Sequence, residues 1–195
     1  MPALQAATVV SESFCELPRI FAPCEFKVKW AQSVWEKSEA RRLRHTVFCI
    51  EQGLFVGDDA DVVDRTAQLI VAIACVGGMA DQVVGCVRIH EAEPGLWWGS
   101  RLAVHPSFRK FSHLATTLIR LAVSSAHARE CRIFLAHVQS QNQPLFERLG
   151  WQSLKTQTLH GLPHELMQAD LALYPPCYDP MTGFVTQPGA PRGRV

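Results

Sequence analysis

A junction between a strand and a long helix, near the middle of the chain, constrains the fold most. Residues 96–104 are predicted to form a strand, and Pro106 cannot continue a strand ladder because it has no backbone N–H. A short polar loop leads into an amphipathic helix over residues 112–129, with Leu114 and Leu118 on one face. The first N–H groups of a helix lack internal partners and lie at its positive end. The junction therefore predicts a site for an anion such as a diphosphate.

The charge distribution agrees with this prediction. Six lysine or arginine residues and one acid lie between Arg101 and Arg132, whereas the whole chain has 19 Lys and Arg against 18 Asp and Glu, a net charge of +1. Such a balanced chain is not expected to bind nucleic acid or membrane surfaces. Ordinary solvated helix flanks remain the alternative explanation for the local basic residues.

Strand and helix signals alternate around the junction and predict a mixed α/β (α+β) fold. Strands are expected at 26–30, 68–76, 82–90, 96–104 and 131–138 and in a final hairpin of 151–158 and 164–173, and helices at 33–51, 112–129 and 144–149. This order indicates a mostly antiparallel sheet with helices on both faces. We expect an N-terminal arm (1–26), one domain (27–174) and a tail rich in Pro and Gly (175–195).

Composition indicates a cytoplasmic protein without a metal centre. No apolar run approaches the roughly 20 residues of a membrane span, and the N-terminus does not read as a secretory signal. The seven cysteines form no CxxC pair, which is typical of reduced thiols. His160 and His164 bracket a turn, but no third residue has the spacing of a zinc ligand.

The central region resembles the GCN5-related N-acetyltransferase (GNAT) superfamily. Leu102 to Pro106 looks like its central strand, Lys110 to Ala115 like its pyrophosphate loop, and Gln139 to Trp151 like its closing segment. The resemblance implies a sheet splayed at its central strands and acetyl-CoA or another acyl-CoA as cofactor. The residues it implies for cofactor binding are Leu102, Ala103, Val104, Arg109, Lys110, Phe111, Ser112, His113, Leu114, Ala115, Thr116, Gln139, Asn142 and Phe146.

Two positions depart from the superfamily pattern. His113 stands where the pyrophosphate loop has its first glycine, so its ring must either turn away or contact the phosphate. Phe146 stands where a tyrosine often protonates the leaving thiolate, and phenylalanine cannot donate a proton. The thiolate must then take its proton from elsewhere or leave as the anion.

The N-terminal half resembles the acyl-homoserine-lactone synthases, which share this fold. The similar segments are Leu43 to Phe48, Glu51 to Phe55, Asp61 to Asp64 and Val84 to Arg88, with Phe55 where tryptophan is usual. The chain as a whole most resembles a group of bacterial acyltransferases associated with nitrogen starvation. Our candidate substrate-binding residues are Arg44, Phe48, Phe55, Asp64, Arg88 and Trp98.

The implied reaction is attack of an amine on a thioester. Glu91 and His137 are the candidate bases, with an exposed turn glutamate and a core histidine as the alternatives. The acidic segment from Glu51 to Asp64 is interpreted as an entrance that attracts an ammonium group, or else as a solvated loop. Arg44 and Arg88 lie in apolar patterns, so we expect them to pair with acids such as Asp61 or Asp64.

The sequence therefore predicts an acyl-CoA-dependent N-acyltransferase, an N-acetyltransferase in the first instance, acting on a small, amino-acid-like amine. One alternative is an N-acyl amino acid or acyl-homoserine-lactone type of synthase with acyl carrier protein as donor. Another is a non-catalytic CoA-binding sensor or scaffold. A homodimer is a further partnership to consider. Adjacent Trp97 and Trp98 point to opposite faces of a strand, so only one can reach any given pocket.

Overall fold

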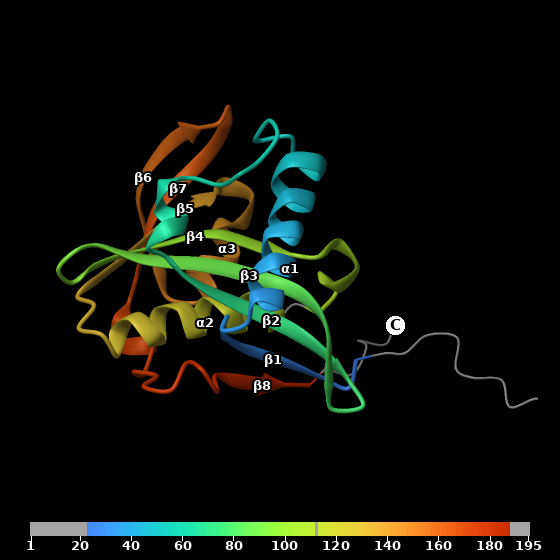
Figure 1. Ribbon diagram of the computed structural model, residues 1–195. Coiled ribbons are helices and arrows are strands. Elements are labelled where there is room, and N and C mark those ends of the chain that lie inside the picture. Colours follow the sequence, from blue (N-terminus) through green and yellow to red (C-terminus); the bar gives the residue numbers. More distant parts are fainter. Residues whose placement is uncertain (1–22, 112, 188–195) are drawn as a thin grey trace, which may run out of the picture.

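A computed structural model describes residues 23–111 and 113–187. Its centre is one eight-stranded sheet of order β6-β7-β5-β4-β3-β2-β1-β8 (Figure 1). The strands are β1 (Glu25–Trp30), β2 (Gln68–Val76), β3 (Met79–Glu93), β4 (Leu96–Val104), β5 (Ile133–Gln139), β6 (Trp151–Leu159), β7 (Leu162–Ala169) and β8 (Phe184–Thr186). The α-helices are α1 (Val34–Arg44), α2 (His113–His127) and α3 (Gln143–Arg148). The predicted mixed sheet with helices on both faces is confirmed.

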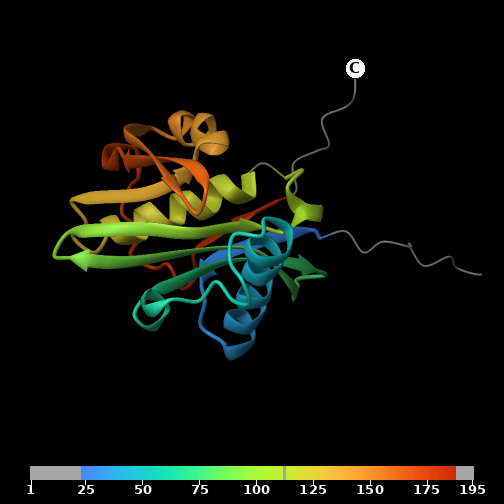
Figure 2. The same cartoon turned by 90° about the horizontal axis from the view of Figure 1, so that it is seen from above.

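The helices cover the sheet from two sides, with α1 on one face and α2 and α3 on the other (Figure 2). Against α2 lies the larger apolar cluster, which includes Phe26, Phe134 and Leu118. Against α1 lies a smaller cluster that includes Leu43, Val71 and Cys86. Strand residues alternate between these clusters, so each strand sends every second side chain to the same helix layer.

The first predicted helix is divided in two. Ser33 caps α1 by accepting a hydrogen bond from the N–H of Glu36, whose carboxylate accepts in return from the N–H of Ser33. From His45 to Glu51 the chain continues as a π-helix. A π turn advances the side chains by less rotation per residue than an α turn, and such turns recur at functional sites. It brings Phe48 and Gln52 to the cavity described below.

The central strands part in the middle of the sheet. β4 and β5 are parallel and pair only from Leu96–Ile133 to Gly99–Ala136. Beyond Gly99, the described part of β5 offers β4 no partner on that side. Within β4, the pairing with β3 shifts between Cys86 and Arg88, and Arg101 adopts a φ of 55°. This β-bulge bends β4 away from β5, and it opens a V-shaped split toward the carboxyl ends of both strands.

Part of the predicted tail packs on the sheet. β8 pairs antiparallel with β1, and the N–H of Trp30 donates to the carbonyl of Pro180. Gly183 (φ 64°) is required there, because a Cβ would collide with the carbonyl oxygen of Val28. The predicted arm lies almost wholly outside the described residues, as do positions 188–195. No helix of the described residues is long and apolar enough to cross a membrane.

Candidate acyl-transfer site

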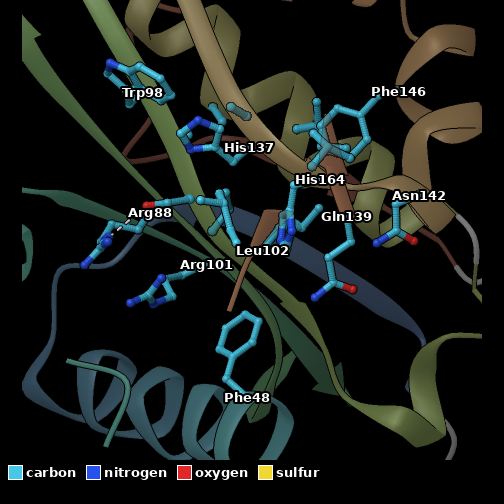
Figure 3. A pocket seen from close by; sticks show the side chains of 18 of the residues that line it. Phe48, Arg88, Trp98, Arg101, Leu102, His137, Gln139, Asn142, Phe146 and His164 are labelled. Atoms are coloured by element: carbon cyan, nitrogen blue, oxygen red, sulfur yellow. Dashed lines mark hydrogen bonds between the residues drawn. The ribbon is translucent and has the colours of Figure 1, made fainter. Parts of the chain in front are cut away.

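A cavity of about 340 Å³ passes through the sheet at the β4–β5 split (Figure 3). On the α2 side its walls are apolar and come from four elements; they are Ile119, Ala122, Val123, Phe134, Ala136, Val138, Phe146 and Trp151. On the α1 side its walls are mixed; they are Phe48, Gln52, Leu54, Phe55, Arg88, His90, Trp98, Ser100, Arg101, His137, Gln139, Leu159, His160 and His164. We call these the apolar half and the polar half of the cavity.

Cross-strand pairing assigns the polar half to one face of the sheet. His90 lies opposite Trp98, and Arg88 opposite Ser100, so each pair shares a face. Trp98 points into the cavity, whereas Trp97 is 7% exposed in the α2-side core, as expected for neighbours on a strand. The substrate candidates Phe48, Phe55, Arg88 and Trp98 are thus brought together, and Arg44 and Asp64 are not part of the wall.

Three arginines and three aspartates form an ion-pair network behind the polar half. Arg88 binds Asp61 through two hydrogen bonds of 2.6 and 2.9 Å, and Arg44 binds Asp64 through two of 2.6 and 3.0 Å. The expected pairing of both arginines with these acids is confirmed. Asp59, only 1% exposed, accepts from Arg44 and from Arg101. The network fixes the loop that follows the π-helix against β3 and β4.

This network overturns the interpretation of the acidic segment as an entrance for an ammonium group. Asp59, Asp61 and Asp64 are each bound to arginine, and Glu51 forms a bidentate pair with Arg109 at 2.6 and 2.7 Å. Arginine hydrogen bonds hold the pKa values of Asp61 and Asp64 below their usual range, although burial opposes the shift. Asp61 and Asp64 are therefore ionised, and arginines already neutralise them.

His137 lies on the polar half of the cavity. Its ring packs on Trp98 with 5.0 Å between ring centroids, and its side chain is solvent-accessible, so it is not the core histidine of the alternative interpretation. Burial, and then the charge of neighbouring His164, lowers the pKa of His137. The imidazole is accordingly neutral near pH 7 and can accept a proton.

Glu91, the other predicted base, does not line the cavity. It lies opposite Trp97 and therefore on the α2 face of the β3–β4 hairpin, near its turn. Its carboxylate accepts a 2.8 Å hydrogen bond from the N–H of Gly95 and takes no part in the cavity wall. The side-chain alternation of β3 sends His90 to the cavity and Glu91 away from it. Glu91 has the role of stabilising a turn.

The predicted diphosphate loop follows β4 at the open end of the split. Arg109 does not point freely into it, since its Nε donates to the carbonyl of Val104 and its two amino groups bind Glu51. The ring of His113 turns toward the core, 5.8 Å from the Phe26 ring centroid, and burial lowers its pKa. Leu114 is fully buried, so its side chain cannot contact a ligand. Ser112 lies outside the described residues.

The other predicted cofactor residues divide between the cavity and its surroundings. Four of them line it: Leu102, Gln139, Asn142 and Phe146. Ala103 belongs instead to the α1-side core. The remaining candidates, at β4's end and the start of α2, are outside the wall; they are Val104, Lys110, Phe111, Ala115 and Thr116. Gln139 also donates a 3.1 Å hydrogen bond to Gln52, which ties the end of β5 to the end of the π-helix.

Several wall residues were not among the predicted site residues, namely Gln52, Ser100, Arg101, His160 and His164. They lie on four separate segments, so no local spacing relates them. The one available signal was Arg101, a charge inside an otherwise apolar strand, which is costly unless a partner is present.

The comparisons agree with this fold. Residues 65–153 match the acetyltransferase (GNAT) domain family. A search of the curated proteins finds no match. Among solved structures, a candidate N-acetyltransferase from Lactobacillus plantarum is similar with a TM-score of 0.66 at 20% identity, covering 75% of this chain and 98% of that one. An acyl-CoA N-acyltransferase from Pseudomonas aeruginosa gives 0.59 at 19%, covering 74% and 98%.

The acyl-homoserine-lactone (AHL) synthase LasI is also similar, with a TM-score of 0.60 at 16% identity over 77% of this chain and 91% of that one. At identities of 20% or less, the structural likeness shows the fold alone. The match of residues 65–153 identifies the domain family that this part of the chain resembles. The narrower resemblance to the nitrogen-starvation group stays a prediction. Residues 65–153 thus match the acetyltransferase (GNAT) domain family, and the chain shares its fold with solved structures described as N-acetyltransferases and acyl-CoA N-acyltransferases.

Proposed function

We propose that this chain is an acyl-CoA-dependent N-acyltransferase, with acetyl-CoA as the first donor to test, and that it acts in the cytoplasm on a small, amino-acid-like amine. The observation that carries the proposal is the cavity through the split, because it gives donor and acceptor separate approaches to one point. The apolar half suits an acyl group, and the polar half suits an amine with polar substituents.

The chain's residues fit an acyl-CoA at the split. Residues 100–104 of β4 have no β5 partner among the described residues, so a pantetheine arm can add there as a strand would. The positive end of α2 follows at the open end of the split, where a diphosphate would be held. When bound, acyl-CoA supplies the activated carbonyl on which an amine can act.

Backbone N–H groups of β4 near Leu102 stabilise the negative charge that develops on the carbonyl oxygen. His137 takes the proton that the amine loses as the C–N bond forms and the C–S bond breaks, directly or through one water. The ordinary pKa of a peptide α-amino group is about 7.7–8.0, and a free carboxylate beside the amine raises that value, so the amine needs a base that accepts its proton. Phe146 donates no proton, and the thiolate leaves as the anion or takes a proton from water.

The test measures CoA release over a panel of amino acids and simple amines with acetyl-CoA and longer acyl-CoAs. We expect thiol release that depends on the acceptor, and a His137→Gln variant with a kcat lowered about 10² to 10⁴-fold and unchanged CoA affinity. No CoA binding at millimolar concentration contradicts the proposal. Binding without turnover favours a sensor, and turnover only with carrier-bound acyl chains favours the synthase.

A further inference from the structure

The ionisable side chains that line the polar half of the cavity are all basic. Its wall contains two arginines and four histidines, which are Arg88, Arg101, His90, His137, His160 and His164. Among the described residues that line it, none is aspartate or glutamate. An acceptor recognised through its ammonium group would need a carboxylate here, and the acids of the neighbouring loop are already bound to arginine.

Arg101 is the wall residue best placed to bind an anion. The bulge in β4 puts it in a left-handed conformation (φ 55°) that non-glycine residues rarely adopt. This conformation turns the side chain to the α1 face beside Ser100, and Figure 3 shows Arg101 at the same end of the cavity as Phe48, opposite Phe146. Strained backbone of this kind persists where the surrounding contacts hold it, and it is concentrated at functional sites.

The contacts of Arg101 leave one donor group unused. Nε and Nη2 donate to the side chain and carbonyl of Asp59, and Nη2 also donates to Asp61. The guanidinium carbon lies 4.5 Å from the Phe55 ring centroid, and the His160 ring packs on Phe55 at 4.8 Å. The described residues provide no hydrogen-bond partner for Nη1. Two acids and one aromatic face therefore hold the guanidinium rigidly while its remaining amino group stays available.

We propose that the acceptor carries a carboxylate and that Arg101 binds this carboxylate through Nη1. The acceptor is then an amino carboxylic acid, with its amine turned toward His137 and its side chain against Phe48, Phe55 and Trp98. The inference deepens the proposed function and rests on it. Arg101 acts as a residue for specificity, because a guanidinium fixed in position recognises a planar carboxylate better than a mobile lysine would.

The test compares each amino acid with its own carboxamide as acceptor for the wild-type enzyme. The carboxamide keeps the side chain but lacks the charge, and its amine has the lower pKa because no neighbouring carboxylate stabilises the ammonium form. The chemistry alone thus favours the amide, so a preference for the acid reports binding. We expect kcat/KM to be at least about tenfold higher for the acid, as for the loss of one charge-assisted hydrogen bond.

Two variants, each of which removes one positive charge, test whether Arg101 is responsible for the preference for the acid over the amide. Arg101→Gln should bring the ratio of acid to amide close to one, mainly through the KM of the acid. Arg65→Gln removes the same charge from an exposed position and should leave the ratio unchanged. Amides that react as well as acids, or a folded Arg101→Gln variant that still prefers acids, overturn the inference while acyl transfer stands. The wild-type comparison decides even if Arg101→Gln does not fold. Failure of every acceptor in both series contradicts the proposed function itself.

Discussion

Replacing Asp59 by asparagine tests whether the ion-pair network stabilises the fold. The carboxylate is buried and accepts from Nε of Arg44 at 2.8 Å and from Nε of Arg101 at 2.9 Å. Asparagine has the same shape and keeps one carbonyl acceptor, but it leaves the buried cluster with three guanidinium groups and two carboxylates. Removing one member of a buried ion pair costs about 3–5 kcal/mol. Because asparagine remains isosteric and the Asp59 carbonyl still accepts from Nη2 of both arginines, we expect the lower end, about 3 kcal/mol.

The assay is urea denaturation followed by circular dichroism, with thermal melting alongside. At about 2–4 °C per kcal/mol for a chain of this length, Tm should fall by roughly 6–12 °C. Asp58→Asn is the matched control, since it removes the same charge from the adjacent, exposed position, where an amide oxygen can still accept from the N–H of Ala60. Free energies of unfolding that agree within about 1 kcal/mol for the two variants would refute the reasoning, because the buried charge would then have no special role.

Three further predictions concern the loop, the π-helix and pH. Ala115→Glu puts a carboxylate in the first turn of α2, where it would repel a bound diphosphate. Calorimetry should show CoA binding weakened at least about tenfold, while the far-UV circular dichroism spectrum stays unchanged. An unchanged affinity for CoA would mean that the diphosphate lies elsewhere. Glu51→Gln breaks the exposed pair between the end of the π-helix and Arg109. Because an exposed ion pair contributes little, the free energy of unfolding should change by less than about 1 kcal/mol in urea denaturation, and a larger loss would contradict this. Burial lowers the pKa values of His90, His113 and His137 below 6.5, so the unfolded state binds more protons and stability should fall as pH drops below about 6.5. Because the pKa values of Asp61 and Asp64 are lowered from 3.8, a second loss should follow below about pH 4, and a Tm that stays constant from pH 7 to 3 would contradict both.

Local patterns were sufficient for most elements. A nearly continuous apolar run predicted β2 with its bounds, the stretch before Pro106 predicted β4 with its bounds, and helical spacing placed α2 within two residues. The division of residues 33–51 into α1 and a π-helix was missed, since both have similar apolar spacing over so short a run. β8 was missed because a strand of three residues owes its existence to β1 beside it.

The sequence by itself determined the strand–loop–helix junction, the opposite orientations of Trp97 and Trp98, and the need of Arg44 and Arg88 for acidic partners. These follow from the covalent chain and from the cost of an unpaired buried charge. Only the tertiary structure decided that His137 faces the cavity while Glu91 faces away, and that Arg101 joins the wall. Register between strands and the bulge in β4 set those outcomes, and both arise from contacts between residues distant in sequence.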